Sequence, residues 1–248
     1  MNKMMNKTKI WAHRGASGYA PENTLEAFHL AVRQGADGVE LDVQMTKDGY
    51  LVVAHDESIE RVSDGHGCVR DFTLSELRGF NFNRTHPEYA RVQIPTLEEV
   101  YECLKPTGMA INVELKTGIF SYPGIEEAVA ALTEKMEMTS QVIFSSFNHR
   151  SVARVKQLCP EAKTGILFAD VMVDTVDYAS RIGVESLHPG LWHLRMPGLA
   201  EEWLHSPLAV HVWTVNEEED MKEMMTLGVD AVITNYPDRA LKVRAGLK

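Results

Sequence analysis

Residues 9–45, KIWAHRGASGYAPENTLEAFHLAVRQGADGVELDVQM, contain the pattern that decides the fold. A short apolar segment, Lys9–Ala12, is followed by an amphipathic stretch, Asn23–Gln34, and then by a second apolar segment, Gly38–Met45. Apolar runs of this length are typical of buried strands, whereas apolar residues spaced three and four apart are typical of a helix that buries one face. The order therefore predicts a strand, a helix and a second strand, which is the repeating unit of a parallel sheet.

Signals for helix ends support this interpretation. Asn23 is placed to cap the first helix, with Glu26 three residues later and Gly35 directly after the last turn. A polar cap followed by Glu satisfies free backbone N–H groups, and glycine readily takes the left-handed conformation that often ends a helix. Thr96 and Glu99 repeat the capping pattern and predict the start of another helix.

The same alternation continues almost to the end of the chain. Eight strand–helix pairs are expected, with strands at Lys9–Ala12, Gly38–Met45, Ala110–Leu115, Val142–Ser145, Thr164–Phe168, Val184–Leu187, Ala209–Thr214 and Ala231–Thr234. No linker rich in Pro or Ser divides the sequence, so residues 1–248 are expected to form one domain. The length fits a (β/α)8 or TIM barrel, typically about 250 residues. An open dinucleotide-binding sheet would carry G-x-G-x-x-G after its first strand, and RGASG at 14–18 does not match it.

One segment, residues 57–95, interrupts this rhythm between the second strand and its helix. Loops in α/β units usually have about two to six residues, so this segment is an insertion. Before it, Asp48-Gly49 is a hairpin signal that predicts a short returning strand, Tyr50–Ala54. Within it, Thr73 and Glu76 form another capping pattern. We therefore expect a structured insertion that acts as a lid or helps to select the substrate.

Composition excludes several classes of protein. The chain has 35 acidic and 25 basic residues, a net charge of −10, and its basic residues do not form a block. Binding to nucleic acids or to anionic membranes depends on clustered Lys and Arg, so neither partner is expected. The sequence makes no prediction about oligomeric state.

Cysteine use and apolar runs indicate a cytoplasmic protein. Cys68, Cys103 and Cys159 are odd in number and far apart, which fits a reduced compartment better than a disulfide-rich secreted fold. Residues 1–7, MNKMMNK, are not followed by the apolar segment that a signal peptide needs. No run of about 18 apolar residues occurs, so stable membrane insertion is not expected.

Three acidic residues lie where the predicted barrel strands end. Glu40 and Asp42 are two residues apart in one strand, so both side chains point to the same face, and Glu114 lies in the next strand of the barrel. The carboxyl ends of the strands of such a barrel converge on one mouth. Burying several carboxylates there is costly unless they pair with cations or bind a metal. Three carboxylates are hard oxygen donors, which suit one Mg²⁺ or Ca²⁺ better than Zn²⁺.

Basic and imidazole side chains surround the same mouth. Arg14 follows the first strand and Lys116 follows Glu114 by two residues, so a metal with these two cations would form a clamp for a phosphoryl group. His13 ends the first strand and His55 ends the hairpin strand. Because the pKa of free histidine is about 6.5, one imidazole could accept a proton while the other donates one.

Two further side chains could line the mouth. Trp213 lies two residues after His211 and has two interpretations, an aromatic wall for a small polyol or simple packing within the barrel. His188, at the end of the sixth expected strand, is the second candidate.

Ordered motifs extend over nearly the whole chain. They are His13-Arg14-Gly15, Pro21-Glu22-Asn23-Thr24, Glu40-Leu41-Asp42-Val43, Asp48-Gly49, His55-Asp56, Ile94–Glu99, Asn112–Lys116, Trp213–Asn216, Gly228–Asp230 and Thr234–Pro237. In this order they resemble the glycerophosphodiester phosphodiesterases, a family of TIM-barrel enzymes with a small insertion after the second strand. The resemblance implies that His13 and His55 are the acid–base pair. It also implies a Mg²⁺ or Ca²⁺ site made by Glu40, Asp42 and Glu114, with Arg14 and Lys116 on the phosphate.

Together with the site residues, the resemblance implies metal-dependent hydrolysis of glycerophosphodiesters to glycerol 3-phosphate and an alcohol. Two alternatives stay open. One is a barrel phosphodiesterase directed at intact phospholipid or sphingolipid, although the insertion looks too polar to meet a bilayer. The other is a non-catalytic barrel that binds glycerol phosphates, against which the retention of both histidines and all three carboxylates argues.

Overall fold

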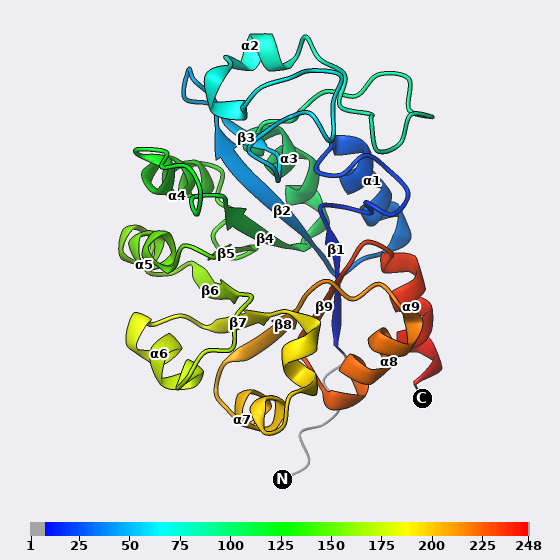
Figure 1. Ribbon diagram of the computed structural model, residues 1–248, viewed down its shortest axis with the longest axis vertical. Coiled ribbons are helices and arrows are strands. Elements are labelled where there is room, and N and C mark those ends of the chain that lie inside the picture. The colour runs from blue at the N-terminus through cyan, green and yellow to red at the C-terminus, as the bar shows by residue number, and fades with distance from the viewer. Residues whose placement is uncertain (1–7, 248) are drawn as a thin grey trace.

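A computed structural model describes residues 8–247. Residues 1–7, on which the prediction about a signal peptide partly rests, and residue 248 lie outside this description. Within it, eight parallel strands form a closed ring (Figure 1): β1 (Lys9–His13), β2 (Gly38–Met45), β4 (Ala110–Leu115), β5 (Val142–Ser146), β6 (Lys163–Phe168), β7 (Ser186–Pro189), β8 (Ala209–Val212) and β9 (Ala231–Thr234). Because β1 pairs with both β2 and β9, the ring closes, and the predicted TIM barrel is confirmed.

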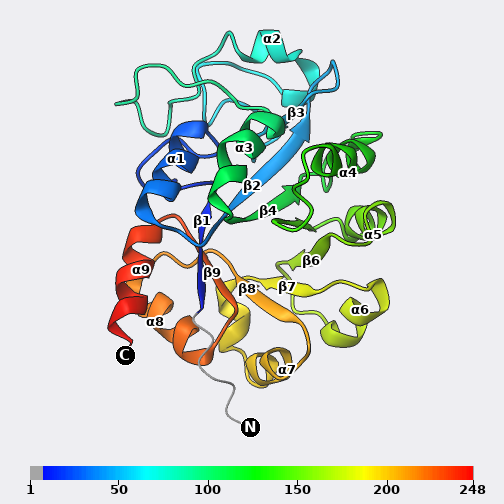
Figure 2. The same ribbon diagram turned by 180° about the vertical axis from the view of Figure 1, so that it is seen from behind.

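Helices follow the parallel strands and form the outer layer of the barrel, as Figures 1 and 2 show from opposite sides. They are α1 (Leu25–Gln34), α3 (Leu97–Leu104), α4 (Ile125–Lys135), α5 (His149–Leu158), α6 (Thr175–Ile182), α7 (Leu199–Leu204), α8 (Glu218–Leu227) and α9 (Pro237–Gly246), with 3₁₀ turns at Lys105–Thr107 and Leu191–Arg195. Their apolar faces bury large side chains against the strands, such as Phe28 and Tyr101 in one half of the barrel and Trp203 in the other. Within residues 8–247, no helix is both long and apolar enough to cross a membrane.

The ends of α1 correct one expectation. Thr24, and not Asn23, is the N-cap, and its side chain accepts a hydrogen bond from the Ala27 backbone N–H. Asn23 has a positive φ of 57° and its side chain is turned toward β2 instead. Gly35 ends the helix in the left-handed conformation, as predicted. The sequence could not separate the two candidates, because Asn and Thr are both good N-caps.

Two of the parallel strands have bounds that differ from the expected ones by two residues, and β1, β5 and β6 each differ by one residue at one end. β7 spans Ser186–Pro189 and not Val184–Leu187, because Gly183 caps the end of α6 and the two residues that follow belong to the connection. In that connection the Glu185 carboxylate accepts from the Thr164 backbone N–H at 2.8 Å. β8 ends at Val212, so Trp213 lies just beyond the strand.

The insertion is a structured unit built on the predicted hairpin. β3 (Leu51–Val53) runs antiparallel to β2, and the segment after it contains a 3₁₀ turn, Val69–Asp71, and the short helix α2 (Leu74–Leu77). The predicted capping boxes that open α2 and α3 are both present. The insertion has an apolar cluster of its own with β3, made by Val52, Ala54, Ile59, Val69, Leu77, Phe82, Val92 and Ile94. Figures 1 and 2 show it at one end of the molecule, beside α1 and α3.

Candidate active site

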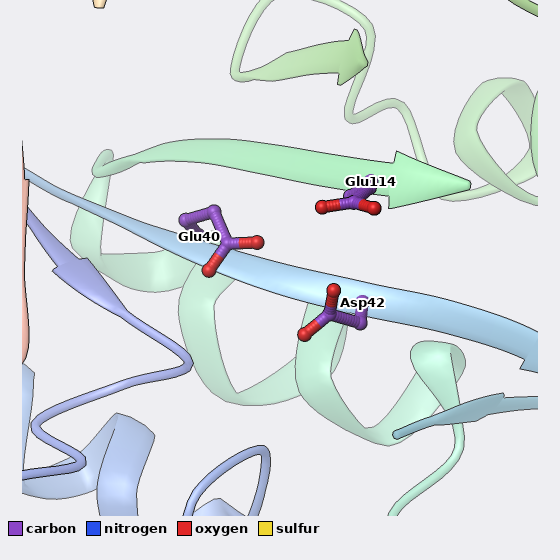
Figure 3. A group of neighbouring side chains, drawn as sticks. All are labelled: Glu40, Asp42 and Glu114. Atoms are coloured by element: carbon purple, nitrogen blue, oxygen red, sulfur yellow. The ribbon is translucent and has the colours of Figure 1, made fainter. Parts of the chain in front are cut away.

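Glu40, Asp42 and Glu114 lie together inside the barrel (Figure 3). Asp42 on β2 is paired with Glu114 on β4, and Glu40 precedes Asp42 by two residues, so the three side chains point into the same space. One carboxylate oxygen from each lies within 4.8 Å of the others, and all three residues are buried. The structure thus brings together the three residues predicted to bind a metal.

Burial and mutual repulsion destabilise the charged forms of Glu40 and Glu114, so the cluster is stable with its full negative charge only beside positive charge. Burial raises the pKa of Glu40 well above its ordinary value, and the negative charges of Asp42 and Glu114 add to the rise. The pKa of Glu114 is raised for the same two reasons, burial and the charge of Asp42. Burial also acts to raise the pKa of Asp42, but Arg14 and other nearby cations outweigh it and hold that pKa well below its ordinary value.

Arg14 is anchored against the cluster by three contacts. It follows β1 directly and has a positive φ of 55°. Its backbone N–H donates to Glu40 Oε2 at 3.0 Å. Its Nη1 donates to Glu22 Oε1 at 2.8 Å, and its Nε lies 3.4 Å from Asp42 Oδ2. These contacts hold the guanidinium in place, and the side chain keeps 16% of its surface exposed.

Lys116 approaches the same carboxylates from the end of β4. Its Nζ donates to Glu114 Oε1 at 2.9 Å and lies 3.8 Å from Asp42 Oδ1. The charges of Glu114 and Asp42 outweigh the effect of burial and raise the pKa of Lys116, so the ammonium stays charged. The two predicted phosphate-binding cations therefore lie on the carboxylate cluster.

His13, at the end of β1, has a neutral hydrogen-bond partner. Its Nδ1–H donates to Asn235 Oδ1 at 2.6 Å, which leaves Nε2 as the unprotonated nitrogen, 3.9 Å from Glu40 Oε2. Burial, with the charge of Arg14, lowers the pKa of His13 to about 4. The ring is therefore neutral at pH 7. Sequence reasoning gave Asn235 no role, although it directly follows β9, at the same end of the barrel as the other site residues.

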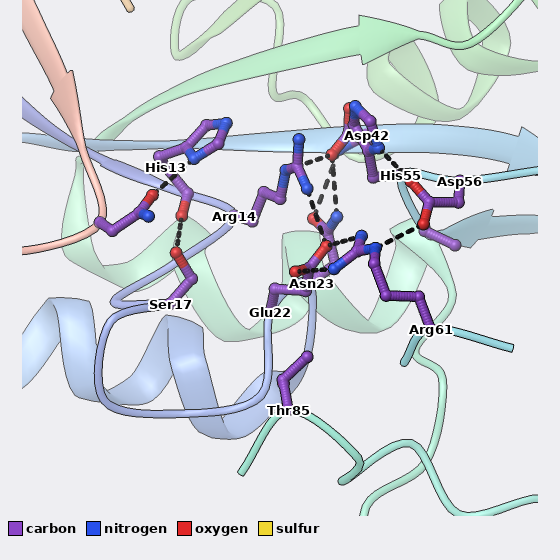
Figure 4. Close-up of polar contacts among 12 residues, drawn as sticks. His13, Arg14, Ser17, Glu22, Asn23, Asp42, His55, Asp56, Arg61 and Thr85 are labelled. Carbon is purple, nitrogen blue, oxygen red and sulfur yellow. Dashed lines mark hydrogen bonds and ion pairs between the residues drawn. The ribbon is translucent and has the colours of Figure 1, made fainter. Parts of the chain in front are cut away.

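His55 has a charged partner instead (Figure 4). Its Nδ1–H donates to Asp56 Oδ1 at 2.6 Å, and the other carboxylate oxygen of Asp56 accepts from Arg61 Nε at 2.5 Å. The hydrogen bond from His55 is the main cause that lowers the pKa of Asp56 well below its ordinary value. The backbone is fixed by Gln44, whose Nε2 donates to the carbonyls of Ala54, His55 and Asp56 at 3.0, 3.2 and 2.7 Å.

A divalent cation fits the carboxylate cluster on two observations. The donors are all carboxylate oxygens, which Mg²⁺ and Ca²⁺ prefer. Asp42 Oδ1 is buried and has no hydrogen-bond partner among residues 8–247, as expected of an atom that faces a metal. The other oxygen, Asp42 Oδ2, accepts from Asn23 Nδ2 at 2.8 Å, so Asn23 orients the carboxylate. Sequence reasoning missed this role because it assigned Asn23 to the helix cap.

Trp213 and His188 lie in different environments. Trp213 Nε1 donates to the His188 carbonyl at 2.7 Å, and its ring packs edge-on against Phe147 and Trp192. Those two rings are 42% and 46% exposed, so the aromatic group reaches the surface and is not confined to the barrel interior. The His188 ring is fully buried, with Nε2 near Ser186 Oγ at 2.9 Å. Its place is therefore within the core of the barrel.

Comparisons with a family model and with known proteins all point to the same family. The model of the glycerophosphoryl diester phosphodiesterase family matches residues 13–239. Glycerophosphodiester phosphodiesterases from Caldanaerobacter subterraneus subsp. tengcongensis and Bacillus altitudinis are each 42% identical to this chain over 97% of it, which is 99% and 100% of their own lengths.

Solved structures agree with these relatives. A phosphodiesterase from Oleispira antarctica, in complex with the product sn-glycerol-3-phosphate, has 30% identity and a TM-score of 0.82, over 95% of this chain and 96% of its own. A putative glycerophosphoryl diester phosphodiesterase from Silicibacter pomeroyi has 25% identity and a TM-score of 0.87, over 98% and 94% of the two chains. With a family match over residues 13–239 and relatives this similar along almost their whole length, the chain belongs to the glycerophosphoryl diester phosphodiesterase family.

Proposed function

We propose that this protein hydrolyses glycerophosphodiesters to glycerol 3-phosphate and an alcohol, with His13 and His55 as an acid–base pair and one Mg²⁺ or Ca²⁺ as cofactor. The observation that carries the proposal is the convergence of three buried carboxylates, two anchored cations and two differently partnered imidazoles at one end of the barrel. The product bound to the relative from Oleispira antarctica supports the same substrate class.

Glu40, Asp42 and Glu114 would hold the cation. Bound there, it would supply Lewis-acid stabilisation of the charge on the phosphoryl oxygens. Arg14 and Lys116 contribute fixed positive charge to the same anion. Since Glu22 holds Arg14 and Glu114 holds Lys116, neither side chain has to be ordered when the phosphodiester binds.

The partners of the two histidines divide their tasks. His13, with a neutral amide on Nδ1 and a pKa lowered to about 4, presents an unprotonated Nε2 and suits the base that activates the nucleophile. His55 donates Nδ1–H to the Asp56 carboxylate, which orients the ring, and in its protonated form the ring would give its Nε2 proton to the leaving alcohol. The nucleophile is a water or the neighbouring hydroxyl of the glycerol. Trp213 would form a wall for the glycerol portion.

The direct test measures glycerol 3-phosphate released from glycerophosphocholine, glycerophosphoethanolamine and glycerophosphoglycerol. Wild-type protein should release it, and His13→Ala and His55→Ala should each lower kcat by about 10²- to 10⁴-fold, the usual contribution of a general acid or base. His66→Ala is the matched control, because His66 lies in the insertion with its side chain 82% exposed. Full turnover in the His13→Ala, His55→Ala double variant would contradict the proposal.

The same assay separates the two alternatives. Turnover of intact phospholipid or sphingolipid in vesicles, with none of soluble glycerophosphodiesters, would favour the lipid-directed enzyme. Binding of glycerol 3-phosphate without turnover of any diester would indicate a binding protein.

A further inference from the structure

We propose that Arg61, in the insertion, is a positioning residue that connects His55 to Arg14 through two carboxylates, Asp56 and Glu22 (Figure 4). The inference rests on the proposed function, because it concerns how the proposed acid and the proposed phosphate-binding arginine are held. Neither Arg61 nor Glu22 is among the residues to which the sequence assigned a role.

The guanidinium of Arg61 binds two carboxylates, one on each of two edges. Nη1 and Nη2 donate to the two oxygens of Glu22 at 2.7 and 2.8 Å, a bidentate pair. Nε donates to Asp56 Oδ2 at 2.5 Å. The planar fork of arginine matches such an arrangement, whereas the single ammonium of lysine does not.

Each carboxylate then continues to a residue of the site. Asp56 Oδ1 accepts from His55 Nδ1–H at 2.6 Å, and Glu22 Oε1 accepts from Arg14 Nη1 at 2.8 Å. The result is an unbroken chain of charge-assisted hydrogen bonds, Arg14–Glu22–Arg61–Asp56–His55. It keeps the His55 Nδ1–H directed at Asp56 and fixes the direction of the Arg14 side chain at the same time.

The chain also attaches the insertion to the barrel mouth. Arg61 follows Ile59, which is fully buried in the apolar cluster of the insertion, while Glu22 belongs to the loop between β1 and α1. A second contact joins the same two segments, since the Tyr89 hydroxyl donates to the Tyr19 carbonyl at 3.3 Å. Without Arg61, the carboxylates of Glu22 and Asp56 would lose their shared cation, and both would be free to rotate away from the residues they hold.

Arg61→Ala and Arg61→Lys test this role against Arg70→Ala. Arg70 is a matched control, because it lies in the same insertion with the same 45% exposure of its side chain, and its guanidinium stacks over the Phe120 ring and does not bridge carboxylates of the site. We expect Arg61→Ala to lower kcat by about 10- to 100-fold, the size of effect known for groups that orient ligands at metal sites. Arg61→Lys should restore less than half of the wild-type kcat, and Arg70→Ala should stay within about twofold of wild type.

Chemical rescue distinguishes positioning from folding. Millimolar guanidinium chloride should raise the kcat of Arg61→Ala severalfold above its value in equal NaCl, and should leave Arg70→Ala unchanged. In ¹⁵N spectra recorded where the ring is neutral, His55 of labelled wild-type protein should show a protonated Nδ1, and in folded Arg61→Lys the two tautomers should both be populated. Wild-type kcat in Arg61→Lys, or a wild-type His55 with protonated Nε2 alone, would overturn the inference. A wild-type protein without turnover would instead overturn the proposed function.

Discussion

Asn23 and Thr24 are adjacent in the chain but serve unrelated purposes. Asn23 Nδ2 donates to Asp42 Oδ2 at 2.8 Å, whereas the Thr24 side chain accepts from the helix backbone of α1. The positive φ of Asn23 makes this possible, because it turns the side chain away from the helix and toward the carboxylate cluster. Substitutions at the two positions should therefore have separable effects on metal binding and on stability.

Asn23→Gly should weaken metal binding without unfolding the protein. Glycine accepts the positive φ freely, so the change removes the side chain and adds no backbone strain. Loss of a group that orients a metal ligand usually lowers metal affinity or activity by about 10- to 100-fold. Calorimetric titration of metal-free protein with Mg²⁺ or Ca²⁺ measures the effect. An unchanged affinity would show that Asp42 needs no support from Asn23.

The proposed metal ligands could be predicted from the sequence more easily than the residues that hold the site in place. Glu40, Asp42 and Glu114 could be predicted because strand ends and two-residue spacing place them in one space. Asn235 follows a strand end as well, so the same rule could have found it. Arg61 could not be found in this way, because it reaches the site from an insertion whose path no periodicity describes.

At the scale of the element, Thr24 gives the clearest prediction. Thr24→Ala removes the N-cap of α1 and should lower the free energy of unfolding by about 1 kcal/mol, within the usual range of about 0.5–2 kcal/mol. Because the Asn23 contact with Asp42 does not use this side chain, kcat should stay near that of wild type. Urea denaturation followed by circular dichroism measures the first value. A loss of activity equal to that of Asn23→Gly would show that the cap and the site are not separable.

Strand positions were predicted better than strand ends. The alternation of apolar runs and amphipathic stretches located all eight parallel strands, since burial on both faces leaves a strong signal. The start of β7 was placed two residues early, because Val184 is apolar but belongs to the connection after Gly183. A local pattern does not show where pairing with a neighbouring strand begins.

At the scale of the whole molecule, buried histidines couple stability to pH. Burial lowers the pKa of His188 to about 3, and its neighbour His211 also has a pKa far below the ordinary value, first through burial and then through His188. In the unfolded chain the pKa of histidine is about 6.5. Between these values the unfolded state binds protons that the folded state does not, so stability falls as the pH is lowered from 6.5.

His188→Gln isolates this effect. Between pH 7 and pH 5, His188 takes up a proton in the unfolded state but not in the folded state. The variant lacks this group, so its free energy of unfolding should rise relative to that of wild type as the pH falls from 7 to 5. The relative gain should approach about 1.4 kcal/mol per pH unit below pH 6. Denaturant melts at a fixed metal concentration measure it. If the difference in the free energy of unfolding between variant and wild type were the same at pH 7 and pH 5, the lowered pKa of His188 would be contradicted.

The proposed dependence on a divalent cation is tested most directly by removing and restoring the metal. Glycerol 3-phosphate release from a glycerophosphodiester is measured after dialysis against EDTA, and again after addition of Mg²⁺ or Ca²⁺. Since Glu40, Asp42 and Glu114 are buried together beside Arg14 and Lys116, we predict that release stops without metal and returns when either ion is added. Full release by the chelated protein would contradict the account.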